Sequence, residues 1–376
     1  MIYLDNAATT KPSEAAVKAM CKAAEYFGNP SSLYGPGLDA EKLINESKAG
    51  IASKLGIEPK CVYFTSGGTE ANNTAVFGTA YSRIKMGKRL ITTSVEHPSV
   101  LEAFKKLETE GFDVVYLGVD GNGRILLDEL EAALTEDTVL VSVMHVNNET
   151  GVIEPVDKIK AVMKKKSPKA LLHCDCVQSF GKLPVLPRKW GADLITISAH
   201  KIHGFKGCGA LCVMNGRLKP LIYGGEQQNS FRPGTENVGG ILAFGAAAKE
   251  CQCDNSYLIE LRNEMKTLLG EKIDNIKFNG SDEYSAGSVL NVSFIGIKAE
   301  ILLHAMETHG VYVSTGSACS SHKPQPSHVL TAMGLNSKEI EGAVRISFDE
   351  SITKAQLKEA ADFFETEVKQ IRRYMR

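Results

Sequence analysis

The chain has 376 residues, of which 43% are hydrophobic, so it can bury a sizeable core over two domains and is not a disordered protein. Its 43 Lys and Arg residues balance 44 Asp and Glu residues, which excludes non-specific electrostatic binding of nucleic acid or anionic lipid by the protein as a whole. No apolar run is long enough to span a bilayer, and Asp5 interrupts the region where a secretory signal would be apolar. We therefore expect a cytoplasmic protein that binds neither nucleic acid nor membrane.

The nine cysteines are an odd number, and no pair has the Cys-x-x-Cys spacing of zinc ribbons or thioredoxin-like motifs. A chain of this length does not need disulfides to stabilise its core. We therefore expect free thiols in a reducing compartment.

Up to about residue 253, short apolar strands alternate with amphipathic helices. This alternation, with strands that are almost continuously apolar, predicts an α/β fold in which helices cover both faces of a mostly parallel sheet of seven strands. The expected strands are 61–65, 89–94, 113–117, 138–144, 170–174, 193–198 and 209–213. The expected helices are 13–27, 38–55, 69–80, 98–110, 127–134, 156–165 and 237–252.

Beyond residue 253 the pattern changes, and a longer charged helix is followed by strands and helices without regular alternation. This predicts a smaller α+β domain. We place the large domain at 12–253 and the small domain at 254–376 together with residues 1–11. The expected elements of the small domain are helices at 256–270, 298–308 and 353–373 and strands near 287–295 and 311–313.

Three polar segments follow predicted strands, where open α/β sheets bind their ligands. The segment TSGGTE at 65–70 offers backbone N–H groups and a helix N-terminus to an anion such as phosphate, or it is an ordinary glycine turn. The segment HCDCVQ at 173–178 carries Asp175, and its cysteines match no zinc spacing. At 198–204, SAHKIHG places Lys201 at a strand end, where it is either a solvated lysine or a partly buried imine-forming amine.

The second half of the chain adds a cysteine and two arginines. Cys319 lies in the small polar segment 314–321, close to His322 and Lys323, which favours a thiolate, although an inert loop cysteine is the alternative. Arg345, in an apolar strand, and Arg232 are candidates to bind a carboxylate or to form surface salt bridges.

In their order along the chain, these motifs resemble the cysteine desulfurases of the NifS/IscS type, which are class V aminotransferase-like enzymes. The resemblance implies fold type I and the cofactor pyridoxal 5′-phosphate (PLP). The Ser/Gly-rich loop around Cys319 is similar to the desulfurases rather than to ordinary aminotransferases. The ten matching segments are YLDNAATT (3–10), FGNPSS (27–32), FTSGGTEANN (64–73), EHPSV (96–100), VNNETG (146–151), DCVQS (175–179), SAHKIHG (198–204), RPGTEN (232–237), GSACSS (316–321) and VRIS (344–347).

The resemblance also implies a role for each matched residue. Lys201 would hold PLP covalently and carry the substrate's α-proton, His97 would stack over the cofactor ring and serve as an acid or base, and the Cys319 thiolate would take the sulfur. Asn148 and Arg345 would bind the substrate carboxylate. The other cofactor-binding residues would be Gly68, Thr69, Ser198 and His200 at the phosphate, Asp175 at the ring nitrogen, Gln178 at the ring oxygen, and Thr235, which would reach the phosphate of the partner subunit.

The implied reaction converts L-cysteine to L-alanine and leaves a persulfide on Cys319. The resemblance further implies a homodimer that passes the sulfur to an acceptor protein, such as an iron–sulfur scaffold or a tRNA thiolation enzyme. Two alternatives stay open: a selenocysteine lyase or other class V PLP enzyme, and a non-catalytic sulfur- or metal-binding protein that uses the cysteines near 174–176 and 251–253. Loop positions depart from the family pattern, among them Gln228, where Glu is common.

Overall fold

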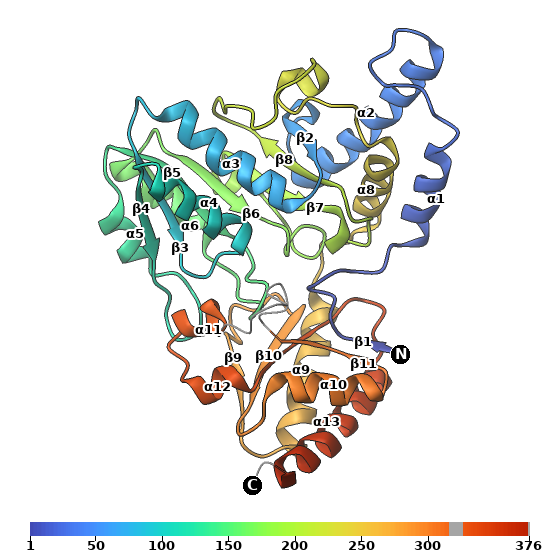
Figure 1. Cartoon of the computed structure of the whole chain (residues 1–376), viewed down its shortest axis with the longest axis vertical. Coiled ribbons are helices and arrows are strands. Elements are labelled where there is room, and N and C mark those ends of the chain that lie inside the picture. Colours follow the sequence, from blue (N-terminus) through green and yellow to red (C-terminus); the bar gives the residue numbers. More distant parts are fainter. Residues whose placement is uncertain (316–325, 375–376) are drawn as a thin grey trace.

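The computed structural model describes residues 1–315 and 326–374, and each of its two parts is built around a sheet (Figure 1). Neighbouring strands of the larger sheet are parallel, except that β8 runs antiparallel to both β2 and β7. The predicted mostly parallel sheet of seven strands is therefore confirmed. In order across the sheet, the strands are β2 (Val62–Thr65), β8 (Gly209–Val213), β7 (Leu194–Ser198), β6 (Leu171–Asp175), β5 (Thr138–Met144), β3 (Arg89–Thr93) and β4 (Asp113–Leu117).

Helices cover both faces of this sheet, because successive side chains of a strand point to opposite sides. Ile91 and Leu172 join one hydrophobic core, whereas their neighbours Leu90 and Leu171 join another. The second core packs against α3 (Gly68–Arg83) and α4 (Pro98–Thr109). The helices at the first core are α1 (Glu14–Ala23), α2 (Gly35–Leu55), α5 (Leu127–Ala133), α6 (Val156–Lys166), α7 (Pro187–Trp190) and α8 (Val238–Glu250).

The smaller part has an antiparallel sheet and a hydrophobic core of its own. Its sheet runs in the order β12 (Ser314–Thr315), β13 (Ala343–Ser347), β10 (Val289–Phe294) and β9 (Ile276–Asn279). Its helices are α9 (Ser256–Lys272), α10 (Ala299–Thr308), α11 (His328–Ala332), α12 (Ser337–Glu341) and α13 (Lys354–Tyr374).

The first residues of the N-terminal arm pack against this smaller part. Strand β1 (Ile2–Tyr3) pairs in parallel with β11 (Val311–Tyr312), and Ile2 and Leu4 are buried in the core of the smaller part. The exact division of the chain at residue 253 stays a prediction.

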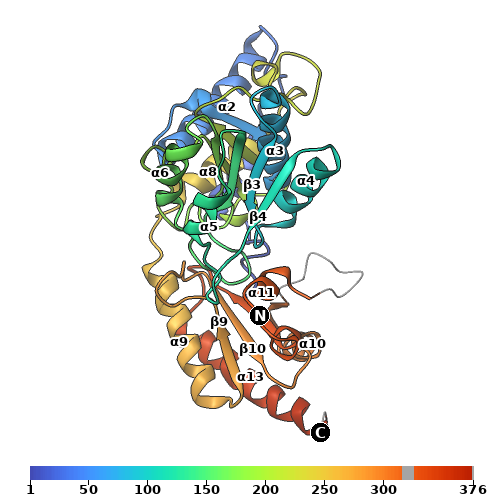
Figure 2. The same ribbon diagram turned by 90° about the vertical axis from the view of Figure 1, so that its left-hand side faces the viewer.

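The parallel strands bring their carboxyl ends to a single edge of the large sheet, which is where open α/β sheets bind ligands. Asp175 ends β6, and His97 follows β3 at the start of α4. Arg345 of β13 lines the same cavity as these two residues, so this edge faces the smaller part of the molecule. Figures 1 and 2 show the two parts stacked with this edge between them.

Candidate active site

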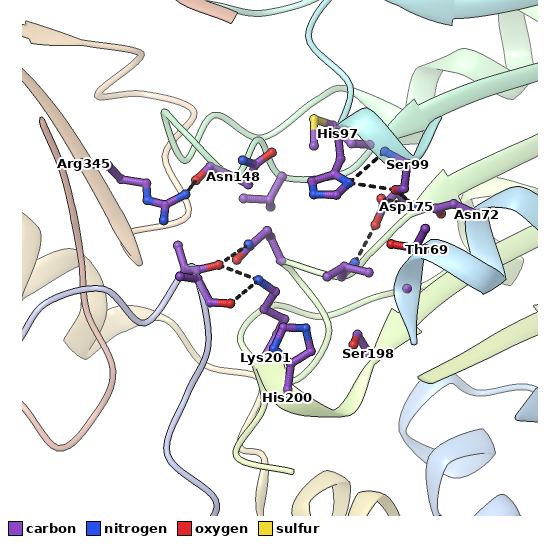
Figure 3. Close-up of a pocket in the computed structure, with 17 residues that line it drawn as sticks. Thr69, Asn72, His97, Ser99, Asn148, Asp175, Ser198, His200, Lys201 and Arg345 are labelled. Atoms are coloured by element: carbon purple, nitrogen blue, oxygen red, sulfur yellow. Dashed lines mark hydrogen bonds between the residues drawn. The ribbon is translucent and has the colours of Figure 1, made fainter. Parts of the chain in front are cut away.

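A cavity of about 320 Å³ lies where the large sheet meets the smaller part (Figure 3). Thr235 is exposed and does not line it, and Cys319 lies outside the described residues. The other predicted site residues all line this cavity: Gly68, Thr69, His97, Asn148, Asp175, Gln178, Ser198, His200, Lys201 and Arg345.

One end of the cavity suits a phosphate group. The N-terminus of α3, at Gly68 and Thr69, brings backbone N–H groups and partial positive charge to it. Ser198 Oγ is buried there, and none of the described residues hydrogen-bonds to it. Gly68 leaves little room to spare, because a Cβ at this position would lie 3.0 Å from Val177 Cγ2.

His200 lines the same cavity as a neutral ring. Burial, reinforced by the charges of Lys201 and Lys206, lowers the pKa of His200 to about 4. Its Nδ1 lies 3.2 Å from Thr9 Oγ1, which ties the ring to the N-terminal arm.

Asp175 presents a carboxylate with fixed hydrogen bonds. Its Oδ2 accepts from Asn72 Nδ2 at 2.7 Å, and its Oδ1 accepts from the Val177 N–H at 2.9 Å. Gln178 Nε2 donates to the Ala7 carbonyl at 2.9 Å, while Gln178 Oε1 is buried without a hydrogen-bond partner in the described part of the chain. The unpartnered oxygens of Gln178 and Ser198, the helix N-terminus and the carboxylate form a set that fits the phosphate and ring of PLP.

The amine of Lys201 is held by the N-terminal arm. Lys201 follows β7 in the short helix η2 (Ala199–Lys201), and its Nζ donates to the carbonyls of Ala7 and Ala8 at 2.7 Å each. The amine therefore reaches the centre of the cavity in a defined position (Figure 3).

Arg345 lies opposite, on the side of the smaller part, with its side chain only 6% exposed. It pairs with Asp5 Oδ1 at 2.8 Å and donates to the Asn148 carbonyl at 3.1 Å. Its Nε is buried with no hydrogen-bond partner among the described residues. Arg232, by contrast, forms a two-point ion pair with Glu70 at 2.9 and 3.2 Å, so it stabilises the turn before α3.

Two cavity residues were missed by the sequence analysis. Asn72 Nδ2 bridges Asp175 Oδ2 and Ser99 Oγ, and Ser99 Oγ lies 2.8 Å from His97 Nδ1. Asn72 could have been found by its spacing, because it lies one helical turn after Gly68 and so shares that residue's face of α3. Nothing in the sequence marks Ser99 beyond its place in the EHPSV segment.

The sequence profile of the class-V aminotransferases matches residues 2–359. The chain belongs to this family. It is 40% identical to the putative cysteine desulfurase IscS 1 of Bacillus subtilis over 98% of this chain and 99% of the relative. It is 41% identical to the cysteine desulfurase IscS of Methanosarcina thermophila over 92% of this chain and 86% of the relative.

Solved structures of similar proteins share the fold of this chain. A NifS-like protein superposes with a TM-score of 0.91 at 35% identity and covers 99% of each chain. SspA in complex with cysteine superposes with a TM-score of 0.83 at 32% identity over 93% of this chain and 99% of the other. The predicted resemblance to cysteine desulfurases of the NifS/IscS type is therefore confirmed.

The alternative of a metal-binding protein finds no support in residues 1–315 and 326–374, where no three His, Cys, Asp or Glu residues gather as metal ligands. Cys174 and Cys176 are fully buried, and burial raises the pKa of both thiols far above neutral pH. Over the same residues, no helix has the length and apolar character needed to cross a membrane.

Proposed function

We propose that this protein is a cysteine desulfurase, which converts L-cysteine to L-alanine and leaves the sulfur as a persulfide on Cys319. The observation that carries the proposal is the convergence of Lys201, Asp175 and Arg345 on one cavity, in a chain about 40% identical to proteins named cysteine desulfurase. We place the reaction in the cytoplasm.

When bound, PLP would supply an electron sink for the α-carbon of an amino acid. The chain's own groups match the parts of this cofactor: a helix N-terminus for the phosphate, a carboxylate for the ring nitrogen and an amine for the aldehyde carbon. The residues that would hold it are Gly68, Thr69, Ser198 and His200 at the phosphate, Asp175 and Gln178 at the ring, Lys201 at the aldehyde carbon, and Thr235 reaching across to the cavity of the partner subunit.

The substrate would be oriented between the two parts of the molecule. The Arg345 guanidinium, whose Nε forms no hydrogen bond with any described residue, would bind the carboxylate of L-cysteine beside Asn148. The Lys201 amine would take the proton from the α-carbon and return it, since it is the amine held in the cavity.

The sulfur acceptor is assigned to Cys319, because none of the eight described cysteines lines this cavity. The described residues that flank segment 316–325 lie near the cavity. On one side, Ser314 pairs with Arg345 in the sheet, and on the other, His328 Nε2 donates to the carbonyl of Glu96, the residue before His97, at 2.9 Å.

In the transfer step, the Cys319 thiolate would attack the substrate's sulfur. A sulfur–sulfur bond forms as the carbon–sulfur bond breaks, so the Cys319 sulfur is oxidised. The electron pair of the broken bond stays on the substrate carbon, which is protonated to give alanine. The persulfide would then be passed to an acceptor protein, such as an iron–sulfur scaffold or a tRNA thiolation enzyme.

The test is mass spectrometry of the purified PLP-loaded protein after treatment with L-cysteine. We expect one added sulfur on the peptide that contains Cys319 and stoichiometric alanine. Cys319→Ala should abolish both while keeping the visible absorbance of the bound cofactor, and Cys21→Ala, at an exposed helix position, is the matched control. Desulfurase activity that survives in Cys319→Ala would refute the assignment. A rate on selenocysteine far above that on cysteine would instead favour a selenocysteine lyase.

A further inference from the structure

The side chain of His97 is held by the residue two positions further along the chain. The Ser99 N–H donates to His97 Nδ1 at 3.1 Å, and Ser99 Oγ lies 2.8 Å from the same nitrogen (Figure 3). A backbone N–H can only donate, so Nδ1 must present its lone pair. A neutral His97 ring therefore carries its hydrogen on Nε2.

The direction of the Ser99 hydroxyl follows from Asp175. An ionised carboxylate only accepts, so the nitrogen of the Asn72 amide, and not its oxygen, must face Asp175 Oδ2 at 2.7 Å. The other hydrogen of that nitrogen goes to Ser99 Oγ at 2.9 Å. Because Ser99 Oγ accepts from Asn72, its own hydrogen is left for His97 Nδ1.

The surroundings of His97 also favour a neutral ring. Burial, the largest influence, lowers its pKa; Lys201 and His328 act in the same direction, and only Asp175 opposes them. His97 is the N-cap of α4, where the positive end of the helix disfavours an imidazolium. A proton added at Nδ1 would replace the lone pair that accepts both hydrogen bonds from Ser99.

We propose that Ser99 is a positioning residue that fixes His97 as a neutral ring with its hydrogen on Nε2, so that His97 acts as a hydrogen-bond donor toward the cavity and not as a base. The α-proton of the substrate is then left to Lys201. The role of His97 in the reaction rests on the proposed function, but the position of its ring hydrogen on Nε2 does not. Of the two roles expected for His97, acid or base, only the one that donates through the Nε2 hydrogen is kept.

The test is nitrogen NMR of the full chain labelled with ¹⁵N-histidine, with and without PLP. The His97 signals are assigned among the nine histidines as those lost in His97→Gln. We expect a lone-pair shift at Nδ1 and an N–H shift at Nε2 throughout pH 6 to 8. In Ser99→Ala, which keeps the backbone N–H but loses the hydroxyl, the His97 titration midpoint should rise by about 0.5 to 1 pH unit.

Ser99→Thr keeps a hydroxyl and should restore the wild-type midpoint, which a loss of packing alone would not explain. The acidic limb of kcat against pH should not move with the midpoint, because a ring protonated at Nδ1 still carries its hydrogen on Nε2. A proton on Nδ1 in the wild-type protein, or the same midpoint in wild type and Ser99→Ala, would overturn the proposal. Because the NMR signal does not depend on turnover, a protein that forms no persulfide could still bear out the hydrogen position, so the two proposals fail separately.

Discussion

The guanidinium of Arg345 is fixed by groups of its own chain. Asp5 and the Asn148 carbonyl each accept a hydrogen bond from one Nη group, which aligns the planar guanidinium fork. Within residues 1–315 and 326–374, no group bonds to Nε, so this nitrogen is the one proposed to bind a ligand. A lysine ammonium has no such fork and cannot reproduce three directed contacts from one plane. The shape of this side chain, as well as its charge, should therefore matter for substrate binding.

Arg345→Lys should raise KM for L-cysteine by about tenfold or more, because it keeps the charge but loses the directed Nε–H contact with the carboxylate. The kcat value should fall less than the affinity does. Steady-state kinetics of the PLP-loaded protein measure both, with Arg373→Lys at an exposed position of α13 as control. An unchanged KM in Arg345→Lys would mean that the carboxylate binds elsewhere.

Gln228 shows how a departure from the family pattern can be explained only with coordinates. Its side-chain Oε1 accepts from the Phe64 N–H at 2.6 Å, and its Nε2 donates to the Phe64 carbonyl at 2.8 Å. The amide thus satisfies both backbone groups of an edge-strand residue, which a glutamate could not do because it has no donor. From the sequence, the change was visible, but its partner 164 residues away was not.

At the level of elements, strand β6 carries a histidine that stays neutral in the folded protein at pH values where an exposed histidine is charged. His173 is fully buried between β5 and β7, where Ser142 Oγ lies 2.8 Å from Nδ1 and Thr196 Oγ1 lies 3.0 Å from Nε2. Burial lowers its pKa from the ordinary 6.5 to about 3. The unfolded chain therefore gains a proton between these pH values that the folded chain does not.

The unfolded state binds more protons than the folded state in this pH window. The free energy of unfolding therefore falls as pH falls below 6.5, and His173 accounts for about 1.4 kcal/mol of this loss per pH unit. Glutamine does not titrate, so His173→Gln does not show this loss of stability. The stability advantage of the wild type over His173→Gln should therefore shrink by about that amount between pH 6 and pH 5. Urea unfolding at both pH values measures it, with the exposed His304→Gln as control. A gap that stays constant would contradict the buried neutral state.

The strands of the large sheet could be predicted because they are buried on both sides and so are apolar almost throughout. The direction of β8 could not, since Gly209–Val213 is equally apolar whether it runs parallel or antiparallel. The site was predictable where a polar residue ends or closely follows a strand, as Asp175 ends β6 and Lys201 follows β7. Asn72 and Ser99 were missed because polar residues in the first turns of helices are common and their partners lie on other elements.

At the scale of the whole molecule, large apolar side chains stay exposed on the chain between α1 and α2 and in the loop before η3 (Gln227–Ser230). Leu33 is 93% exposed, Phe27 85% and Tyr223 78%. Both segments lie at the end of the large part that is farthest from the smaller part (Figures 1 and 2). Exposed apolar groups of this size are typical of a protein–protein interface, and we assign this surface to the proposed homodimer.

Leu33→Asp should shift the protein from dimer to monomer, because the interface would have to bury a charge. The affinity of this variant for PLP should also fall, since the contact proposed between Thr235 and the partner's cavity would be lost. Sedimentation velocity at micromolar concentration gives the mass, and Ile301→Asp, at a half-exposed position of α10, is the control. A monomeric wild type would refute the homodimer, whereas a dimeric Leu33→Asp would place its interface on another surface.

The N-terminal arm has a consequence for the order in which the protein matures. Ala7 and Ala8 hold Lys201, which lies more than 190 residues later in the chain, and Asp5 holds Arg345, 340 residues later. At usual ribosomal speeds, Arg345 is added roughly 20 to 70 s after Asp5. The arm must wait through most of synthesis for Arg345, so a nascent chain can have all seven strands of the large sheet and still lack a finished cavity. Binding of the substrate carboxylate therefore has to wait until Arg345 has been added.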